Sequence, residues 1–234
     1  MATIQGFPVV LLPGPRGVRL VSTARLRDPV LNALIDTEEE RRAIEEIESF
    51  SSGRLTAERR GTTSIGAGEF VRAVPHAAFI NASFAYFRPR ELNRFNGPER
   101  GAWYASLTGT ATCVAEITWH IERELARIDR FETRIEYAEL FASFAGEFVD
   151  LRDLPADPAC LDPDTAVGYQ AGNALADAVR RKGINGIVYP SLRDPDGTNL
   201  VALFPHAVQS VAQGDVLELR WEGKPGPIVR RVVA

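Results

Sequence analysis

The strongest constraint on the fold lies in residues 110–128, TATCVAEITWHIERELARI, where apolar side chains repeat with the period of an α-helix. Three other side chains of this stretch, Glu116, His120 and Glu124, lie four positions apart and share an adjacent face. The apolar stripe, which one buried face requires, consists of Val114, Ile117, Ile121, Leu125 and Ile128. The pattern therefore predicts a helix that is buried along one side and carries Glu116 near its start.

Two predicted elements are defined by their position relative to this helix. A short buried strand, GAWYAS at 101–106, precedes it directly and carries Tyr104. A second helix is predicted after Asp164, a typical N-cap residue, and ends at Lys182–Gly183. The expected apolar face of this second helix consists of Val167, Ala171, Leu175 and Val179.

Strand-forming segments account for much of the remaining chain. Residues 132–140 and 144–151 are predicted to pair as a hairpin, and the aromatic-rich FINASFAYF at 79–87 is predicted to be a strand. The N-terminal apolar run at 7–12 is expected to end at PGPRG, and residues 19–26 fit either a strand or a loop. Further strands are expected at 184–191, 199–204, 216–221 and 228–233.

The order of these elements predicts a single mixed α+β domain with an N-terminal extension, because no internal repeat, low-complexity segment or linker divides the chain. The extension covers residues 1–70 and is expected to pack on the core. It is expected to be partly helical, with Thr37 and Glu40 forming a capping box at the start of a helix. Residues 71–234 form the main domain.

Composition and charge exclude several classes of protein. A net charge of −4 argues against a nucleic-acid-binding surface, and Cys113 and Cys160 do not form a disulfide framework. The first apolar run has no basic segment before it and is broken by Pro13 and Pro15, so it does not fit a signal peptide. No apolar run is long enough to span a bilayer. We therefore expect a cytoplasmic protein that contacts neither membrane nor nucleic acid.

Common catalytic and cofactor motifs are absent from the sequence. SIGAGEF lacks the third glycine of a dinucleotide-binding loop, and no Walker motif or GxSxG nucleophile elbow occurs. The three histidines, His76, His120 and His206, are scattered and form no HExxH motif, so we expect no metal. Glu116 and His120 could share a ligand, but an exposed helical pair is the simpler interpretation.

Four polar residues remain as candidates for a site. Arg94 lies between an aromatic segment and a glycine-bearing loop that leads into a buried strand, a setting that suits an inward-facing guanidinium able to grip phosphate. Tyr104 could provide a platform for a planar ring. Each also has a simple structural role: a surface arginine, a strand tyrosine, a helix glutamate in Glu116 and a turn serine in Ser191. Spacing alone does not decide between the two interpretations.

A family resemblance favours the functional interpretation. RFNGPERGAWYAS (94–106), TATCVAEITWHIER (110–123) and GIVYPSLRDPDGTNLVALFP (186–205) follow one another as in larger members of the RES domain family, which is named for its arginine, glutamate and serine. The resemblance covers roughly residues 79–206. One departure is Gly97, where an acidic residue is often expected, and residues 1–70 match only as the variable N-terminal part.

The resemblance implies a bacterial toxin of a RES–Xre toxin–antitoxin pair, with a fold like that of diphtheria-toxin-like ADP-ribosyltransferases. Such a protein consumes NAD⁺ as substrate without a metal. Its partner is an Xre-type DNA-binding antitoxin that blocks the active site. The expected reaction breaks the nicotinamide–ribose bond and transfers the ADP-ribosyl group to a protein target in nucleotide metabolism.

The same resemblance assigns roles to individual residues. Glu116 faces the positive charge that develops on the ribosyl carbon, and Arg94 neutralises the pyrophosphate, with Arg193 as a second phosphate contact. Tyr104 stacks on or beside the nicotinamide ring. Ser191 hydrogen-bonds the ribose or the nicotinamide amide.

Three alternatives stay open. The chain could degrade NAD⁺ by hydrolysis or phosphorolysis, it could cleave another N-glycoside, or it could be a non-enzymatic interaction module with the same fold. The sequence does not identify the ADP-ribosyl acceptor, the protein target or the oligomeric state.

Overall fold

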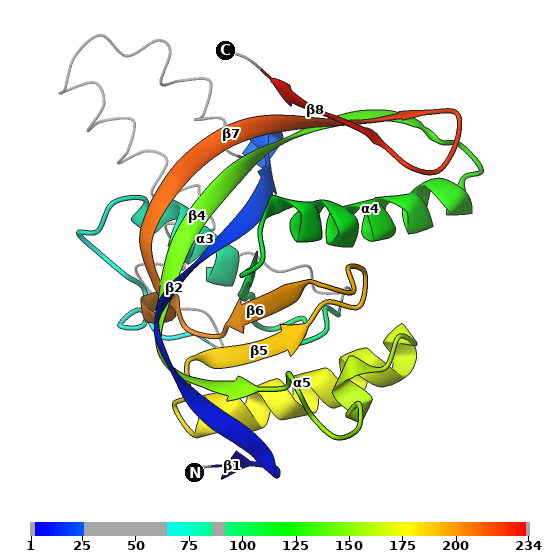
Figure 1. Cartoon of the computed structure of the whole chain (residues 1–234). Helices are drawn as coiled ribbons and strands as arrows, with labels where there is room; N and C mark the ends of the chain where they lie inside the picture. The colour runs from blue at the N-terminus through cyan, green and yellow to red at the C-terminus, as the bar shows by residue number, and fades with distance from the viewer. Residues whose placement is uncertain (1–2, 26–64, 86–91, 233–234) are drawn as a thin grey trace, which may run out of the picture.

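The computed structural model describes residues 3–25, 65–85 and 92–232, and these form a long bent sheet with a helix packed on each side of its shorter strands (Figure 1). The helix predicted from Thr37 lies outside the described residues. Helix α4 (Thr110–Arg127) lies beneath the arch of the long strands. Strands β5 (Gly186–Pro190) and β6 (Thr198–Ala202) run across the middle, and helix α5 (Thr165–Arg181) lies below them. A mixed α+β single domain, as predicted, is therefore what the described residues form.

The sheet has eight strands in the order β1-β2-β3-β6-β5-β4-β7-β8, and β2 also pairs with β4. Among the described strands, only β4 and β5 pair in parallel. Because β4 pairs with both β5 and β2, the strands from β2 through β3, β6 and β5 to β4 form a closed ring. The strands are β1 Thr3–Ile4, β2 Phe7–Ser22, β3 Trp103–Ser106, β4 Glu132–Asp150, β5 Gly186–Pro190, β6 Thr198–Ala202, β7 Val208–Glu222 and β8 Ile228–Val232.

Strand β2 corrects the expectation that the first apolar run ends at PGPRG. The strand continues through this segment, and its register against β4 shifts between Pro13 and Arg16. Proline cannot donate a ladder hydrogen bond, so it is tolerated where the pairing is irregular. The prolines therefore mark a bulge within one strand.

The predicted hairpin at 132–140 and 144–151 is wrong, because both halves belong to the continuous strand β4. Gly146 has a φ of 107°, yet it pairs in register with Leu12 of β2 and the chain does not reverse there. Residues on both sides of the expected turn pair with β2, while the opposite edge of the strand pairs with β7 up to Phe144 and with β5 at residues 148–150. Flanking strands on both edges hold the segment extended, and their positions cannot be read from local pattern.

The predicted strand at 79–87 is also wrong, because the described part of it lies in helix α3 (Ala77–Ala85). Ile80 and Phe84, four residues apart, are both buried against the core. Asn81 points to the same side and uses its amide to bond the backbone N–H and C=O of Val71. Strand propensity of the aromatic residues is overridden here by tertiary packing.

Helix α4 (Thr110–Arg127) confirms the helix predicted from the apolar period. Val114, Ile117 and Ile121 pack against the cluster that includes Leu125 and residues of β2 and β7. Ile128 departs from the prediction, since it follows the last helical residue and is 67% exposed.

Helix α5 (Thr165–Arg181) begins and ends as predicted. The Asp164 carboxylate accepts a hydrogen bond from the Ala166 N–H at 2.9 Å, and Gly183 follows the helix with a φ of 69°. Its buried face differs in part from the expected one, since Val167 is exposed. The residues buried on this helix are Gly168, Gly172, Leu175, Ala176 and Val179.

The N-terminal residues belong to the same sheet as the rest of the chain. Strand β2 pairs with β4 from Val9 to Ser22, and Ile65 and Phe70 are buried in the main core cluster. The proposed division at residue 70 stays a prediction, although these contacts join β2 tightly to the strands that follow.

Candidate active site

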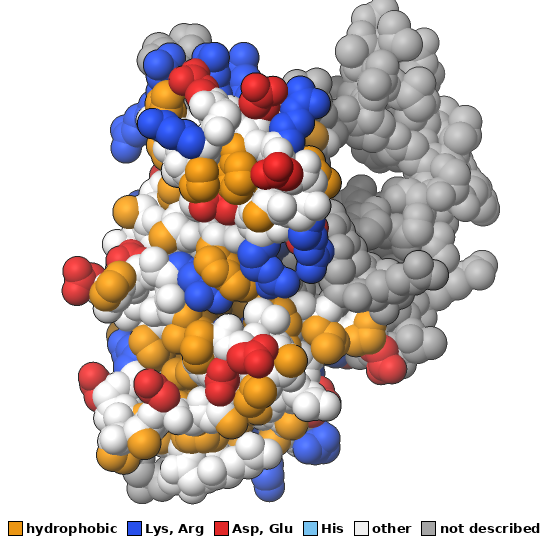
Figure 2. Space-filling model, turned by 90° about the vertical axis from the view of Figure 1, so that its right-hand side faces the viewer, with side chains coloured by type: hydrophobic (Ala, Val, Ile, Leu, Met, Phe, Trp, Pro, Cys, Tyr) orange, Lys and Arg blue, Asp and Glu red, His pale blue; other side chains and the backbone are white. Residues whose placement is uncertain are grey.

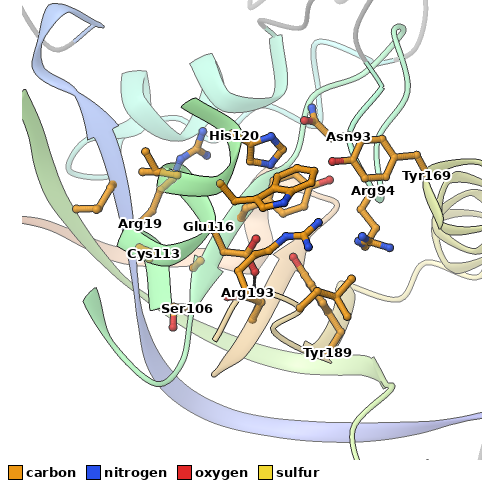
Figure 3. A pocket seen from close by; sticks show the side chains of 17 residues that line it. Arg19, Asn93, Arg94, Ser106, Cys113, Glu116, His120, Tyr169, Tyr189 and Arg193 are labelled. Carbon is orange, nitrogen blue, oxygen red and sulfur yellow. Dashed lines mark hydrogen bonds between the residues drawn. The ribbon is translucent and has the colours of Figure 1, made fainter. Parts of the chain in front are cut away.

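A pocket of about 260 Å³ lies between α4, β3, the end of β5 and the start of β6 (Figure 3). This volume is slightly below that of typical small-molecule sites, about 300–1,000 Å³. Glu116 lies in the middle of the view, with Arg19 to one side and Arg94 and Tyr169 to the other. The pocket therefore brings together residues from segments that are far apart in the sequence.

Glu116 projects from the second turn of α4 and is held at one oxygen. Its Oε1 accepts hydrogen bonds from the Ser191 hydroxyl at 2.7 Å and from the Asn199 amide at 2.8 Å. Among the described residues, nothing donates to its Oε2. The carboxylate is thus fixed in orientation while one oxygen stays available to a ligand.

Ser191 is positioned by the turn between β5 and β6. Its hydroxyl oxygen accepts hydrogen bonds from the N–H groups of Arg193 and Asp194, and its single hydrogen is donated to Glu116. The turn is tied to α4, because Thr112 donates to the Asp194 carboxylate at 2.6 Å. Ser191 is 7% exposed and does not line the pocket. It therefore lies behind Glu116.

Arg94 is nearly buried, at 9% exposure, and only part of its guanidinium is used by the fold. Nη1 donates to the carbonyl oxygens of Cys160 at 2.7 Å and Asp162 at 3.0 Å. No described residue accepts a hydrogen bond from Nε or Nη2. The guanidinium carbon also lies 5.4 Å from the centre of the Tyr169 ring. The side chain is thus anchored through Nη1, while Nε and Nη2 remain available to a ligand.

Two glycines of α5 make room for Arg94. A Cβ on Gly172 would lie 2.1 Å from the Arg94 carbonyl oxygen, and one on Gly168 would lie 2.5 Å from Nη1. Asn173, on the same helix, donates to the Asn93 carbonyl at 2.8 Å. Helix α5 therefore packs closely against the segment that carries Arg94.

Tyr104 forms part of the wall that β3 contributes to the pocket. Its hydroxyl accepts a hydrogen bond from the Phe95 N–H at 3.0 Å and donates to Asn96 Oδ1 at 2.9 Å. Burial raises the pKa of this phenol well above its ordinary value. The hydroxyl therefore stays protonated and fixes the segment around Arg94, while the ring faces the pocket.

Arg193 spans the pocket from the β5–β6 turn to α4. Its guanidinium carbon lies 3.6 Å from the centre of the Trp119 ring, and that of Arg123 lies 4.7 Å from the same ring. Such cation–π contacts orient a guanidinium without using its hydrogen-bond donors. Arg193 therefore remains able to bind an anion.

The pocket carries more positive than negative charge. Arg19, Arg94 and Arg193 line it, whereas Glu116 is the only acidic lining residue in the described part of the chain. Figure 2 shows Lys and Arg side chains gathered across the middle of one face, at the height between α4 and α5. A ligand with negative charge remote from its reacting atom fits this arrangement.

No group of three or more His, Cys, Asp or Glu side chains among the described residues could hold a metal ion. No helix in the described ranges is long and apolar enough to cross a membrane.

Four of the five site residues expected from sequence line the pocket, namely Glu116, Arg94, Tyr104 and Arg193, while Ser191 contacts Glu116 from behind. Sequence reasoning missed other members. Asn199 lies within strand β6 and Trp119 lies within helix α4, so neither had a distinguishing local signal. The glycine pair four residues apart in α5 was a usable signal, since it indicates a close backbone approach. The missed lining residues include Arg19, Trp119, Tyr169, Tyr189 and Asn199.

The described residues form a mixed α+β fold with a pocket in which arginines surround an anchored carboxylate. The RES domain family model matches residues 69–222, which is more than half of the 234 residues, and the chain belongs to this family. The fold is also similar to the crystal structure of the M. tuberculosis MbcT–MbcA toxin–antitoxin complex. That similarity has 14% identity and a TM-score of 0.42, and covers 88% of this chain and 85% of that chain. No curated protein sequence matches the chain significantly.

Proposed function

We propose that this protein is a RES toxin that binds NAD⁺ in the pocket and cleaves the nicotinamide–ribose bond. The observation that carries the proposal is the state of Glu116, whose Oε1 is fixed by Ser191 and Asn199 while Oε2 has no protein partner among the described residues. A carboxylate held in this way is preorganised to meet a positive charge. The surrounding arginines suit the pyrophosphate of the same substrate.

Cleavage of the nicotinamide–ribose bond requires little besides stabilisation of the developing charge. Nicotinamide leaves as a neutral ring, so the leaving group needs no proton. The ribosyl carbon becomes oxocarbenium-like as the bond breaks, as in glycoside cleavage. The Glu116 carboxylate opposes this charge and accepts a hydrogen bond from a ribose hydroxyl. Both interactions strengthen towards the transition state, which is the condition for raising kcat.

The other residues bind and orient the dinucleotide. Arg94 and Arg193 contact the phosphates with the donors that the fold leaves unused. The Tyr104 ring is one wall for the nicotinamide. Ser191 acts as a positioning residue, because its only hydroxyl hydrogen is donated to Glu116. A direct contact from Ser191 to the ribose or the amide would require that bond to break.

We propose transfer of the ADP-ribosyl group to a protein target in nucleotide metabolism as the cellular reaction, with hydrolysis or phosphorolysis of NAD⁺ as the alternative. The relation to diphtheria-toxin-like ADP-ribosyltransferases and the cytoplasmic location belong to the same proposal. An Xre-type antitoxin that covers the pocket is the proposed partner. A dead pocket that only binds a partner is less consistent with an anchored carboxylate and unused arginine donors at one site.

The test follows nicotinamide release from NAD⁺ by the purified full chain, together with growth on expression in cells. Isotope-labelled NAD⁺ added to a lysate separates the alternatives: one labelled protein band indicates transfer, free ADP-ribose indicates hydrolysis, and ADP-ribose 1″-phosphate indicates phosphorolysis. We expect growth arrest that a co-expressed antitoxin relieves. Normal growth at high soluble expression with unchanged cellular NAD⁺ would falsify the proposal.

A further inference from the structure

His120 lines the same pocket as Glu116 and has no role in the mechanism so far. It lies one helical turn further along α4, so both side chains project from the same face (Figure 3). No described residue forms a hydrogen bond with either ring nitrogen. The ring packs edge to face against the Trp119 indole, with the two ring centroids 4.8 Å apart. An imidazole is thus held beside the carboxylate with both nitrogens available.

We infer that His120 is the general base that removes the proton from the group attacking the ribosyl carbon. This inference rests on the proposed cleavage of NAD⁺. An incoming hydroxyl must lose its proton as the new C–O bond forms. Glu116 cannot take that proton without losing the charge that stabilises the oxocarbenium. A second group in the same pocket is therefore required, and among its lining residues the imidazole is the usual choice for such a step.

The charges around the imidazole favour its neutral, basic form at neutral pH. His120 is exposed overall, and the partial loss of hydration where its ring lines the pocket lowers its pKa. Glu116 on the same helix opposes that effect, while Arg123, Arg193 and Arg94 reinforce it. The pKa lies below the ordinary histidine value, so the ring is mostly unprotonated at pH 7 and can accept a proton.

The proposed step balances without a further reactant. The C–N bond breaks and its electron pair leaves with neutral nicotinamide. The acceptor oxygen forms the C–O bond, and its proton moves to His120, which later releases it to solvent. This chemistry selects an acceptor with an O–H to lose, namely water or an alcohol. An anion such as phosphate would need no base.

The experiment measures nicotinamide release at saturating NAD⁺ across about pH 5–9, for the wild type and His120→Gln. Glutamine keeps a polar side chain of similar size. Glu124→Gln is the matched control, because Glu124 lies one turn further along the helix, is exposed and, among the described residues, pairs with Arg127 alone. Thermal melting checks that each variant is folded. Azide is added in parallel, since it attacks as an anion and needs no base.

We expect wild-type turnover to fall as the pH drops through the histidine pKa, and His120→Gln to lose both this acid limb and about 10²–10⁴-fold in rate at neutral pH. Azide should restore turnover to His120→Gln and yield an azido product. Free imidazole should do the same for His120→Ala, where a space is left. ¹⁸O-water distinguishes water from an alcohol as the acceptor.

Three results would overturn the inference: an unchanged rate and pH profile in His120→Gln, no selective effect of azide, or turnover that depends on added phosphate and not on His120. If the wild type is active and His120→Gln matches it, only the role of His120 is wrong. A folded wild type that releases no nicotinamide overturns the proposed function and the inference together.

Discussion

Glu116 differs from the two other glutamates that follow it on α4 in what its oxygens contact. Glu122 Oε1 accepts hydrogen bonds from the Trp221 indole and the Gly226 N–H, so this residue ties the helix to the β7–β8 hairpin. Glu124 pairs with Arg127 on the exposed surface. Only Glu116 lines the pocket, which separates a catalytic candidate from a structural and a solvated glutamate on one helix.

Glu116→Gln is expected to fold normally and to lose about 10²–10³-fold in kcat, because it removes the charge aimed at the transition state. Glutamine retains the volume and most of the helix propensity. KM should change little, since the charge matters mainly once the bond is breaking. The measurement is nicotinamide release at saturating NAD⁺, with melting as the fold check.

Glu124→Gln is the control for this experiment, whereas Glu122→Gln is expected to lower stability by weakening its contacts with Trp221 and Gly226. Near-full turnover in a folded Glu116→Gln variant would show that the catalytic assignment is wrong. If Glu124→Gln loses activity instead, the functional face of α4 must be assigned two turns further along the helix, at Glu124.

Ser191→Ala tests whether this serine positions Glu116 or binds the substrate. Removing its hydroxyl deletes one of the two hydrogen bonds to Oε1, so kcat should fall roughly tenfold, the worth of one such bond. KM should stay unchanged, because Ser191 does not line the pocket. Steady-state kinetics give both constants, and a rise in KM at constant kcat would favour direct contact with the substrate.

Arg94→Ala is expected to raise KM about ten- to a hundredfold, since a charge-assisted phosphate contact contributes about 1.5–3 kcal/mol. The fold should also become less stable, because the carbonyls of Cys160 and Asp162 lose their donor. Binding of NAD⁺ and thermal unfolding are measured on the same variant. An unchanged KM would count against Arg94 as the phosphate ligand.

At the scale of elements, α5 controls the site through its glycines. Gly172→Ala is expected to lower both stability and NAD⁺ affinity, because its Cβ would lie 2.1 Å from the Arg94 carbonyl and must displace that segment. On an exposed helical surface the same change would stabilise the protein by about 0.4–1 kcal/mol. Denaturant unfolding should therefore show a loss of stability in Gly172→Ala, together with a higher KM for NAD⁺. A freely exposed position would instead show a gain in stability.

Gln170→Ala is the matched control for Gly172→Ala, since Gln170 lies on the same helix and is exposed. It should leave stability and KM near the wild-type values. If Gly172→Ala stabilises the protein with KM unchanged, the close approach of α5 to Arg94 does not constrain the site.

At the scale of the whole molecule, one partly buried ion pair joins the segment before α3 to the core. Arg100 donates to Glu69 Oε2 at 2.6 Å and to the Leu203 carbonyl at 3.2 Å. Burial alone would raise the pKa of Glu69, but the hydrogen bonds from Arg100 and the Gly66 N–H outweigh it, so the pKa lies below the ordinary value. A carboxyl with a lowered pKa stabilises the folded state above its unfolded pKa and loses that effect as pH falls through the folded one.

Stability is therefore expected to decrease on acidification below the ordinary glutamate pKa, about 4.3, and part of this decrease should vanish in Glu69→Gln. The readout is the melting temperature as a function of pH for both proteins. A Glu69→Gln curve parallel to that of the wild type through the acid range would contradict this role for the ion pair.

The sequence by itself determined the elements whose signal is local. The face of α4, the strand with Tyr104 and the capping of α5 by Asp164 follow from period and residue type within one segment. The family motifs also singled out Glu116 and Arg94 before any geometry was known. These features depend on neighbours a few residues away, which is why a linear reading finds them.

Tertiary structure alone decided the features that depend on distant partners. The single strand β4 is held extended by strands on both edges, and α3 is helical because Ile80 and Phe84 pack on a core formed by other segments. Ser191 lies behind Glu116, 75 positions away in sequence, and Asn199 joins it from 83 positions away. The closure of the sheet brings these remote hydrogen-bond partners together, and no local sequence pattern predicts this.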